Sequence, residues 1–210
     1  MIWKPFTCFA MRSPCRLQCC PACPPGPAPG ATVIGFVSPV AVDSLTFGQA
    51  FLDAHATTAM LLNRLCLPVM SVTVEPIDSA ELGQFTFTNV PAGNYVLHIH
   101  RPGWLPRTLA VTVPFPPNSM IHLQPPDGPV FILIAGDVNG DGVVDSVDKD
   151  ILMDHMYSKF GEPNYLPEAD LDADGHICAR DRSILFTNMH RRSSAYSGFA
   201  GCAVRMNSEQ

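Results

Sequence analysis

The sequence predicts a mixed fold, in which a small antiparallel β-sandwich is followed by an all-α module of two loop–helix repeats. Short apolar runs bounded by Gly, Pro and Asn recur over residues 31–125, and the chain of 210 residues holds 21 Pro and 15 Gly. This composition favours short strands joined by turns. Most acidic residues lie after residue 136, where two stretches 33 residues apart place Asp and Gly at matching offsets. Clustered carboxylates of this kind repel one another unless a cation holds them.

The first region contains several short strands. Residues 85–90 alternate apolar and polar side chains, a turn of Pro, Ala, Gly and Asn follows, and residues 95–100 resume the strand pattern. Further strands are expected at 32–37, 69–74, 109–113 and 121–123. Residues 47–64 have the composition of a helix but only weak helical periodicity, so the pattern leaves this element open.

One run within this region carries a family resemblance. The segment GQFTFTNVPAGNYVL at 83–97, followed by Pro-Gly-Trp at 102–104, resembles carboxypeptidase-regulatory-like (transthyretin-like) β-sandwich domains. The resemblance is good over 85–125 and loose over 31–84. It implies a structural spacer over residues 31–125 and no chemistry of its own.

His98 and His100 lie on the same face of the strand at 95–100, where two imidazoles can share a metal ion. His122 is the only candidate for a third ligand, and it is a weak one. The favoured interpretation is that both histidines are polar residues on a solvent-exposed face, opposite the apolar face of the strand.

The first acidic loop begins at residue 137. Calcium takes six to eight oxygen ligands, and a twelve-residue loop supplies them from positions 1, 3, 5, 7, 9 and 12, with Gly at position 6 for the turn. Here Gly142 stands at position 6. The expected ligands, in order, are Asp137, Asn139, Asp141, the Val143 carbonyl, Asp145 and Asp148.

The second loop repeats this pattern from residue 170, again with Gly at position 6. Position 9 is Cys178, a poor calcium ligand, so this loop is expected to be the weaker one. The expected ligands are Asp170, Asp172, Asp174, His176 at position 7 and Asp181. The sequence therefore predicts two calcium sites.

Apolar periodicity predicts a helix after each loop, over 146–160 and from 179 to about 190. The segment before the first loop is β-like and ends at Gly136, so the entering helix of an EF-hand is absent, and position 12 is Asp in place of Glu. With these features, the run Gly136-Asp137-Val-Asn139-Gly-Asp141-Gly142 and the later Asp148-x-x-Ile151-Leu152 closely resemble the dockerin family over residues 136–190. The resemblance implies a calcium-dependent docking module that binds a cohesin-type domain, in an extracellular or cell-surface setting.

The resemblance also implies which residues contact the partner, because dockerins use loop positions 10 and 11 and the early part of the following helix. In this sequence these are Ser146, Val147, Met153 and Asp154 in the first repeat, and Ala179, Arg180, Phe186 and Thr187 in the second. The two sets differ in charge and size, which predicts a single docking orientation, with the first repeat slightly favoured. The alternative is that Met153 and Phe186 pack between the two helices.

The rest of the sequence narrows the function. The formal net charge of −6 argues against nucleic-acid binding, and no stretch approaches the ~18 apolar residues of a membrane span. No catalytic motif is present, so we expect that the chain is not an enzyme. We also expect a monomer. The expected domains are a Cys- and Pro-rich disordered leader (1–30), the β-sandwich (31–125), a linker or edge strand (126–135), the dockerin-like module (136–192) and a tail (193–210). The leader is a poor secretory signal, and its Cys20 and Cys23 have the spacing of a metal or redox pair. The alternative function is a calcium-stabilised structural or adhesion module without a cohesin partner.

Overall fold

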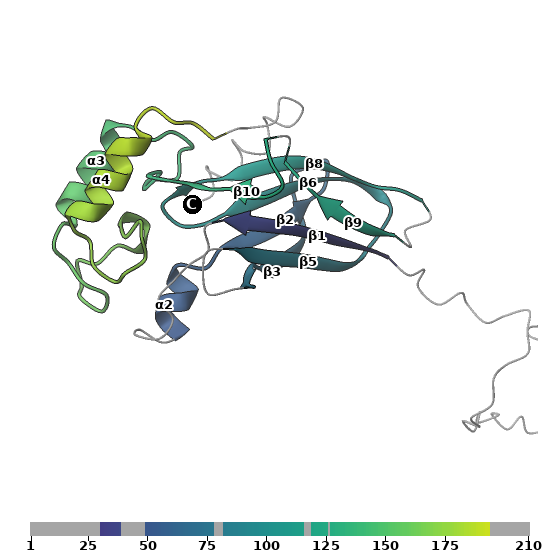
Figure 1. The fold of residues 1–210 in the computed structure, drawn as a ribbon, viewed down its shortest axis with the longest axis horizontal. Helices are drawn as coiled ribbons and strands as arrows, with labels where there is room; N and C mark the ends of the chain where they lie inside the picture. Colours follow the sequence, from purple (N-terminus) through teal and green to yellow (C-terminus); the bar gives the residue numbers. More distant parts are fainter. Residues whose placement is uncertain (1–29, 39–48, 78–81, 116–118, 126, 194–210) are drawn as a thin grey trace, which may run out of the picture.

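The structure is a computed structural model, and it describes residues 30–38, 49–77, 82–115, 119–125 and 127–193. Residues 1–29 of the expected leader, with the Cys20 and Cys23 pair, and residues 194–210 of the expected tail lie outside these ranges. In the described ranges, a region of β-sheet precedes a helical region (Figure 1).

The first sheet is built around β1 (Ala31–Ser38). Its strand order is β10-β1-β5-β4, and β9 also pairs with β1. The pairing of β1 with β5 is antiparallel, but β9 and β10 both run parallel to β1, so the prediction of an antiparallel fold over residues 31–125 is wrong for β9. The chain enters β9 from β8 of the other sheet, and such a crossover allows parallel pairing. The other strands are β4 (Glu75–Pro76), β5 (Gly83–Val90), β9 (Met120–Leu123) and β10 (Phe131–Ile132).

The second sheet has the order β3-β2-β6-β8 and is antiparallel throughout. Its strands are β2 (Thr58–Leu62), β3 (Pro68–Thr73), β6 (Gly93–His100) and β8 (Arg107–Val113). The segment that sequence periodicity left open divides into a short helix, α2 (Gln49–Ala54), and the inner strand β2. Burial alternates along β2 as far as Leu61, and Leu62 next to it is also buried, so the strand departs from strict alternation at its end.

One hydrophobic core joins the two sheets and the helical region. Phe85 and Phe87 enter it from the first sheet, and Leu97 and Ile99 enter it from the second. The same cluster continues through buried leucines of the helical region, Leu152, Leu171 and Leu185. The helical region is therefore packed onto the sheets through apolar contact, the main source of stability for such a junction.

The predicted solvent-exposed position of His98 is wrong. Only 4% of His98 is exposed, and its ring stacks with that of His100 at a centroid distance of 6.3 Å. Burial, with a smaller contribution from His100, lowers the pKa of His98 to about 4. Buried Leu62 and Val96 form a second small apolar cluster, so burial in β6 is not confined to one face. In the described part of the chain no third His, Cys, Asp or Glu joins the two histidines in a metal-binding group.

The helical region lies at one end of the sheets, with α2 close to its loops (Figure 1). A short ladder between β7 (Trp104–Leu105) and β11 (Ile134–Ala135) leads into it. It contains α3 (Ser146–Asp154), the 3₁₀-helix η1 (Pro167–Ala169) and α4 (Ala179–Asn188). Both α-helices begin at the predicted residue, but α3 ends six residues before the predicted end at 160.

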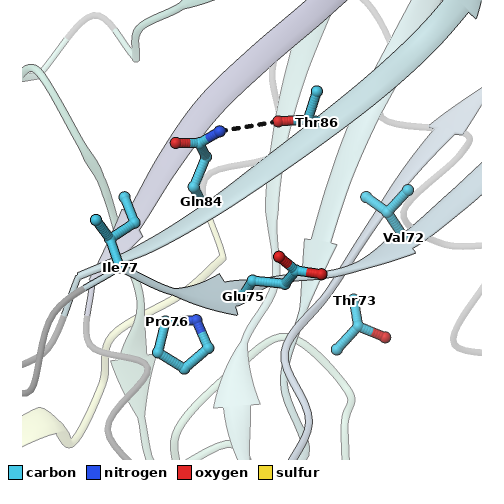
Figure 2. A pocket seen from close by; sticks show the side chains of 7 residues that line it. All are labelled: Val72, Thr73, Glu75, Pro76, Ile77, Gln84 and Thr86. Atoms are coloured by element: carbon cyan, nitrogen blue, oxygen red, sulfur yellow. Dashed lines mark hydrogen bonds between the residues drawn. The ribbon is translucent and has the colours of Figure 1, made fainter.

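A cavity of about 490 Å³ lies where β3, β4 and β5 meet (Figure 2). Gln84 donates a hydrogen bond to the Thr86 hydroxyl across one wall, at 3.0 Å. Glu75, the one ionisable residue among those that line it, is exposed. The cavity therefore lacks the convergent buried polar groups typical of a ligand site.

None of the described helices is long and apolar enough to span a membrane.

Candidate functional site

The first acidic loop is a tight turn held by hydrogen bonds to the oxygens of its own side chains. The Gly142 N–H donates to Asp137 Oδ2 at 3.0 Å. Two further N–H groups, of Asp141 and Val143, donate to Asn139 Oδ1 at 3.0 Å and Asp141 Oδ1 at 2.9 Å. Gly142 has a φ of 85°, a left-handed conformation that favours glycine. These hydrogen bonds hold the side chains at positions 1, 3 and 5 against the backbone of the turn.

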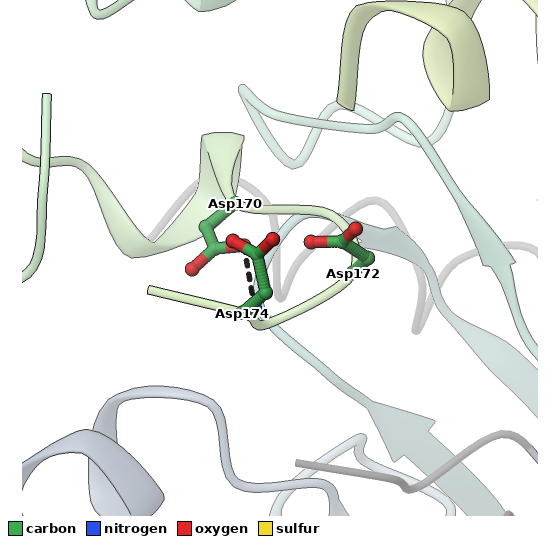
Figure 3. A group of neighbouring side chains, drawn as sticks. All are labelled: Asp170, Asp172 and Asp174. Atoms are coloured by element: carbon green, nitrogen blue, oxygen red, sulfur yellow. Dashed lines mark hydrogen bonds between the residues drawn. The ribbon is translucent and has the colours of Figure 1, made fainter. Parts of the chain in front are cut away.

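The second loop has the same arrangement. The Gly175 N–H donates to Asp170 Oδ2 at 2.8 Å, and the His176 N–H donates to Asp174 Oδ1 at 2.9 Å. One carboxylate oxygen from each of Asp170, Asp172 and Asp174 lies within 4.8 Å of the others. Figure 3 shows the three carboxylates around one point on the loop. This spacing suits three oxygen ligands of a single calcium ion, whose Ca–O distances are about 2.3–2.6 Å.

The aspartate at position 12 connects each loop to its helix. Asp148 accepts hydrogen bonds from Val138 and Asn139 through Oδ1, at 2.8 and 3.1 Å, and from Asp145 through Oδ2 at 2.8 Å. Asp181 does the same in the second loop, with donors Leu171, Asp172 and Cys178 at 2.8, 3.4 and 2.8 Å. Each aspartate also completes a capping box at the start of α3 or α4. The loop and the helix that follows it therefore form one unit.

The two units pair with each other through their backbones. After α3, the Tyr157 N–H donates to the Ile177 carbonyl, and the Ile177 N–H donates to the Ser158 carbonyl. After α4, 33 residues later, the His190 N–H donates to the Val144 carbonyl and the Val144 N–H donates to the Arg191 carbonyl. The segment that follows each helix thus lies against the loop of the other unit.

The loops are electrostatically unfavourable without a cation. Burial, with smaller contributions from neighbouring acids, raises the pKa of Asp137 and of Asp170 to about 7. Burial also raises the pKa of Asp172. Oδ1 of Asp137 and Oδ1 of Asp172 are buried without a hydrogen-bond partner. A buried carboxylate oxygen without a donor is costly, and a hard divalent cation held by oxygen ligands would remove that cost.

The residues expected to contact a partner are all exposed. Val147 is 51% exposed, Met153 43% and Phe186 51%, so the alternative that Met153 and Phe186 pack between the helices is wrong. Arg180 is exposed but forms an ion pair with the second loop, in which its Nε lies 2.8 Å from Asp172 Oδ2. The remaining exposed residues of the two sets are Ser146, Asp154, Ala179 and Thr187.

Two residues near the second loop, His55 and Tyr165, were not predicted as site residues from the sequence. The Tyr165 hydroxyl donates to Asp170 Oδ2 at 2.6 Å, and His55 Nε2 lies 2.8 Å from that hydroxyl. Burial, with a smaller contribution from Arg101, lowers the pKa of His55 to about 4, so the ring is neutral near pH 7. His55 and Tyr165 lie 110 positions apart, and no sequence motif links them.

Comparisons with known proteins locate this helical region within a family. A family model for the dockerin type I domain matches residues 135–189. The fold is similar to two crystal structures, of an N-terminal and a C-terminal interface mutant of a type II cohesin–X–dockerin complex from Acetivibrio cellulolyticus. Each matched chain is 24% identical, covers 80% of this chain and is itself covered completely, with TM-scores of 0.55 and 0.53. No curated protein matches the chain. Residues 135–189 are therefore a dockerin type I domain.

Proposed function

We propose that this chain is a calcium-dependent docking protein, whose dockerin domain binds a cohesin-type domain of another protein. The observation that carries the proposal is the pair of loops, 33 residues apart, in each of which the aspartate at position 1 accepts the N–H of the glycine at position 6, within the segment that matches the dockerin type I family. The similar crystal structures, which are of a type II cohesin–X–dockerin complex, support the choice of partner.

Each loop would bind one calcium ion. The proposed ligands of the first site are Asp137, Asn139, Asp141, the Val143 carbonyl, Asp145 and Asp148. Those of the second are Asp170, Asp172, Asp174, the His176 carbonyl and Asp181. Calcium would neutralise the buried carboxylates and order the loops, which in turn fix the first turns of α3 and α4. The chain's own residues supply the exposed docking surface on those helices.

We propose one docking orientation, with recognition by a single repeat. Met153 and Phe186 occupy equivalent positions on α3 and α4, and Val147 is the counterpart of Arg180. A surface complementary to Val147 and Met153 is apolar and does not match the charged side chain of Arg180. Because Arg180 is already paired with Asp172, the first repeat remains the favoured contact surface.

The sheet region would act as a spacer that presents the dockerin domain, and we interpret its two sheets as the β-sandwich expected at residues 31–125. We expect no catalytic activity from the chain, since dockerin domains dock and do not catalyse. An extracellular or cell-surface location, as part of an assembly of cellulosome type, follows from the same family.

The test is binding of the full chain to a panel of cohesin domains by calorimetry, in calcium and in excess chelator. Binding to at least one cohesin that disappears in chelator would support the proposal. A chain that binds calcium but no cohesin would indicate the alternative, a calcium-stabilised structural or adhesion module.

Matched substitutions test the orientation. Met153→Glu and Phe186→Glu place the same charge at equivalent, half-exposed positions. With one orientation, only one of them abolishes binding, and Met153→Glu is the expected one. Equal partial losses from both would mean two orientations. Unchanged helicity in calcium serves as the control that each variant is folded.

A further inference from the structure

The two loops differ in what surrounds the aspartate at position 1. Asp137 in the first loop accepts the Gly142 N–H through Oδ2, and its Oδ1 has no hydrogen-bond partner. Asp170 in the second loop accepts the equivalent Gly175 N–H, but it also accepts the Tyr165 hydroxyl on the same oxygen and the Asp174 N–H on Oδ1. The second loop is thus held by donors that the first loop lacks.

The additional donor leads back to the sheet region. Tyr165 has one hydroxyl proton, and at 2.6 Å from a carboxylate oxygen that proton is donated to Asp170. The hydroxyl oxygen can then only accept from the imidazole of His55, 2.8 Å away, so Nε2 of the neutral ring carries the proton. The result is a directed chain of hydrogen bonds, from His55 to Tyr165 to Asp170.

Aromatic packing fixes this chain in place. The His55 ring is 1% exposed and lies 4.3 Å from the ring of Phe51, which is itself fully buried. Phe51 meets Phe160 edge-on at 4.9 Å, and Phe160 meets Tyr165 edge-on at 5.5 Å. Phe51 lies in α2, and His55 is the first residue after this helix. Phe160 and Tyr165 lie in the connection between the two repeats. Packing of this kind restricts the rotamers of both hydrogen-bonding side chains.

The second loop is also the one with the weaker set of oxygen side chains. Position 9 holds Asp145 in the first loop and Cys178 in the second. The difference is visible in the cap of each helix, where Asp145 Oδ1 accepts the Val147 N–H at 2.8 Å and Cys178 Sγ accepts the Arg180 N–H at 3.4 Å. A loop that lacks one oxygen gains most when its remaining ligands are already oriented, because outer-sphere hydrogen bonds fix ligand direction.

We propose that His55 is an outer-sphere positioning residue of the second calcium site, acting through Tyr165 on Asp170, so that the sheet region sets the calcium affinity of that loop. The inference rests on the proposed calcium binding. With Oδ2 of Asp170 held by Tyr165 and Gly175, Oδ1, which accepts the Asp174 N–H at 3.2 Å, is the oxygen that would face the metal ion. The first loop has no such connection and should be independent of His55.

The experiment follows each loop separately in the full chain. The amides of Gly142 and Gly175 each donate to the position-1 aspartate of their own loop, so their ¹⁵N–¹H signals report the two sites during a calcium titration. The calcium midpoint is the calcium concentration at which a signal has completed half of its shift. We expect His55→Phe and Tyr165→Phe each to raise the midpoint at Gly175 by about tenfold or more, in the range known for outer-sphere substitutions. The midpoint at Gly142 should change by less than about twofold, as for an independent site.

The double variant separates a positioning role from a general structural one. If His55 acts through the Tyr165 hydroxyl, the His55→Phe and Tyr165→Phe effects are not additive. His55→Gln, which retains an N–H donor, should recover part of the affinity. Val96→Ala is the control for a general loss of stability, since Val96 is buried in the separate cluster with Leu62. It should lower thermal stability without changing the ratio of the two midpoints.

Equal weakening at both glycines, additive losses, or an unchanged midpoint at Gly175 would overturn the inference. Failure of the proposed function would look different. In that case the unsubstituted chain would show no calcium response at either Gly142 or Gly175, before any variant is compared.

Discussion

The junction between the sheet region and the dockerin domain can be tested by adding a single methyl group. Gly103 lies in the turn before β7 with a φ of 75°, and its carbonyl accepts the Gly136 N–H at 2.8 Å. A Cβ at this position would lie 2.1 Å from the carbonyl oxygen of Glu168, far inside the 3.4 Å at which ordinary van der Waals contact begins. The obstacle is backbone of η1, directly before the second loop, so it cannot move aside as a flexible side chain would.

The chain supplies a matched control for this substitution. Gly161 also has a left-handed backbone, with a φ of 90°, but a Cβ there would meet nothing within 4 Å. Gly161→Ala should therefore lower the free energy of unfolding only by the cost of a left-handed backbone at alanine, about 1–2 kcal/mol. Gly103→Ala has the same cost plus overpacking of about 1–3 kcal/mol, since the Glu168 backbone must shift.

The assay is thermal unfolding of the full chain in saturating calcium, followed by circular dichroism. For a chain of this size 1 kcal/mol corresponds to roughly 2–4 °C in Tm, so Gly103→Ala should melt at least ~2–4 °C below Gly161→Ala. Its calcium midpoint at the second loop should also rise, because the displaced Glu168 precedes Asp170. Equal Tm values for the two variants would refute the close packing of the sheet region on η1.

Three further predictions concern the loops themselves. Removal of calcium with excess chelator should remove most of the helical signal of residues 130–195 at pH 7, because the carboxylates of each loop repel one another without a cation; unchanged helicity would contradict this. Cys178→Asp should raise the calcium affinity of the second loop by roughly tenfold, since ligand number and charge set the affinity of such loops; calorimetry against the unsubstituted chain measures this, and an equal or lower affinity would count against Cys178 as the weak position. In chelator the pKa values of Asp137 and Asp170, raised to about 7 in the fold, mean that stability is lost as the pH rises through 7. Whatever helicity remains without calcium should therefore be greater at pH 5 than at pH 8, and the opposite order would contradict the burial of these carboxylates.

Local features were predictable from the sequence. The loops follow from Asp and Gly at fixed offsets, and the start of each helix follows from the residue at position 9, which caps it, and from the aspartate at position 12. The strands that alternate apolar and polar residues, such as β5, were also predicted within a residue or two. Each of these is decided by contacts between residues close together in the chain.

Long-range contacts account for what the sequence did not predict. α3 ends at Asp154 although helical periodicity continues to Phe160, because the Tyr157 N–H pairs with Ile177 of the other repeat. His98 is likewise buried, although the alternation of its own strand places it opposite the apolar face. The contact of His55 with Tyr165 is of the same kind. Periodicity describes one element at a time and carries no information about which distant segment will cover it.

The reciprocal pairing of the two repeats also bears on where a recombinant fragment should end. The family match stops at residue 189, but the Val144 N–H pairs with the Arg191 carbonyl and the Ser193 N–H with the Gly142 carbonyl. A fragment cut after residue 189 would leave the first loop without these partners, although it retains every proposed calcium ligand. The smallest fragment in which both loops are closed runs through Ser193, and a fragment with one repeat alone leaves its loop open along one side.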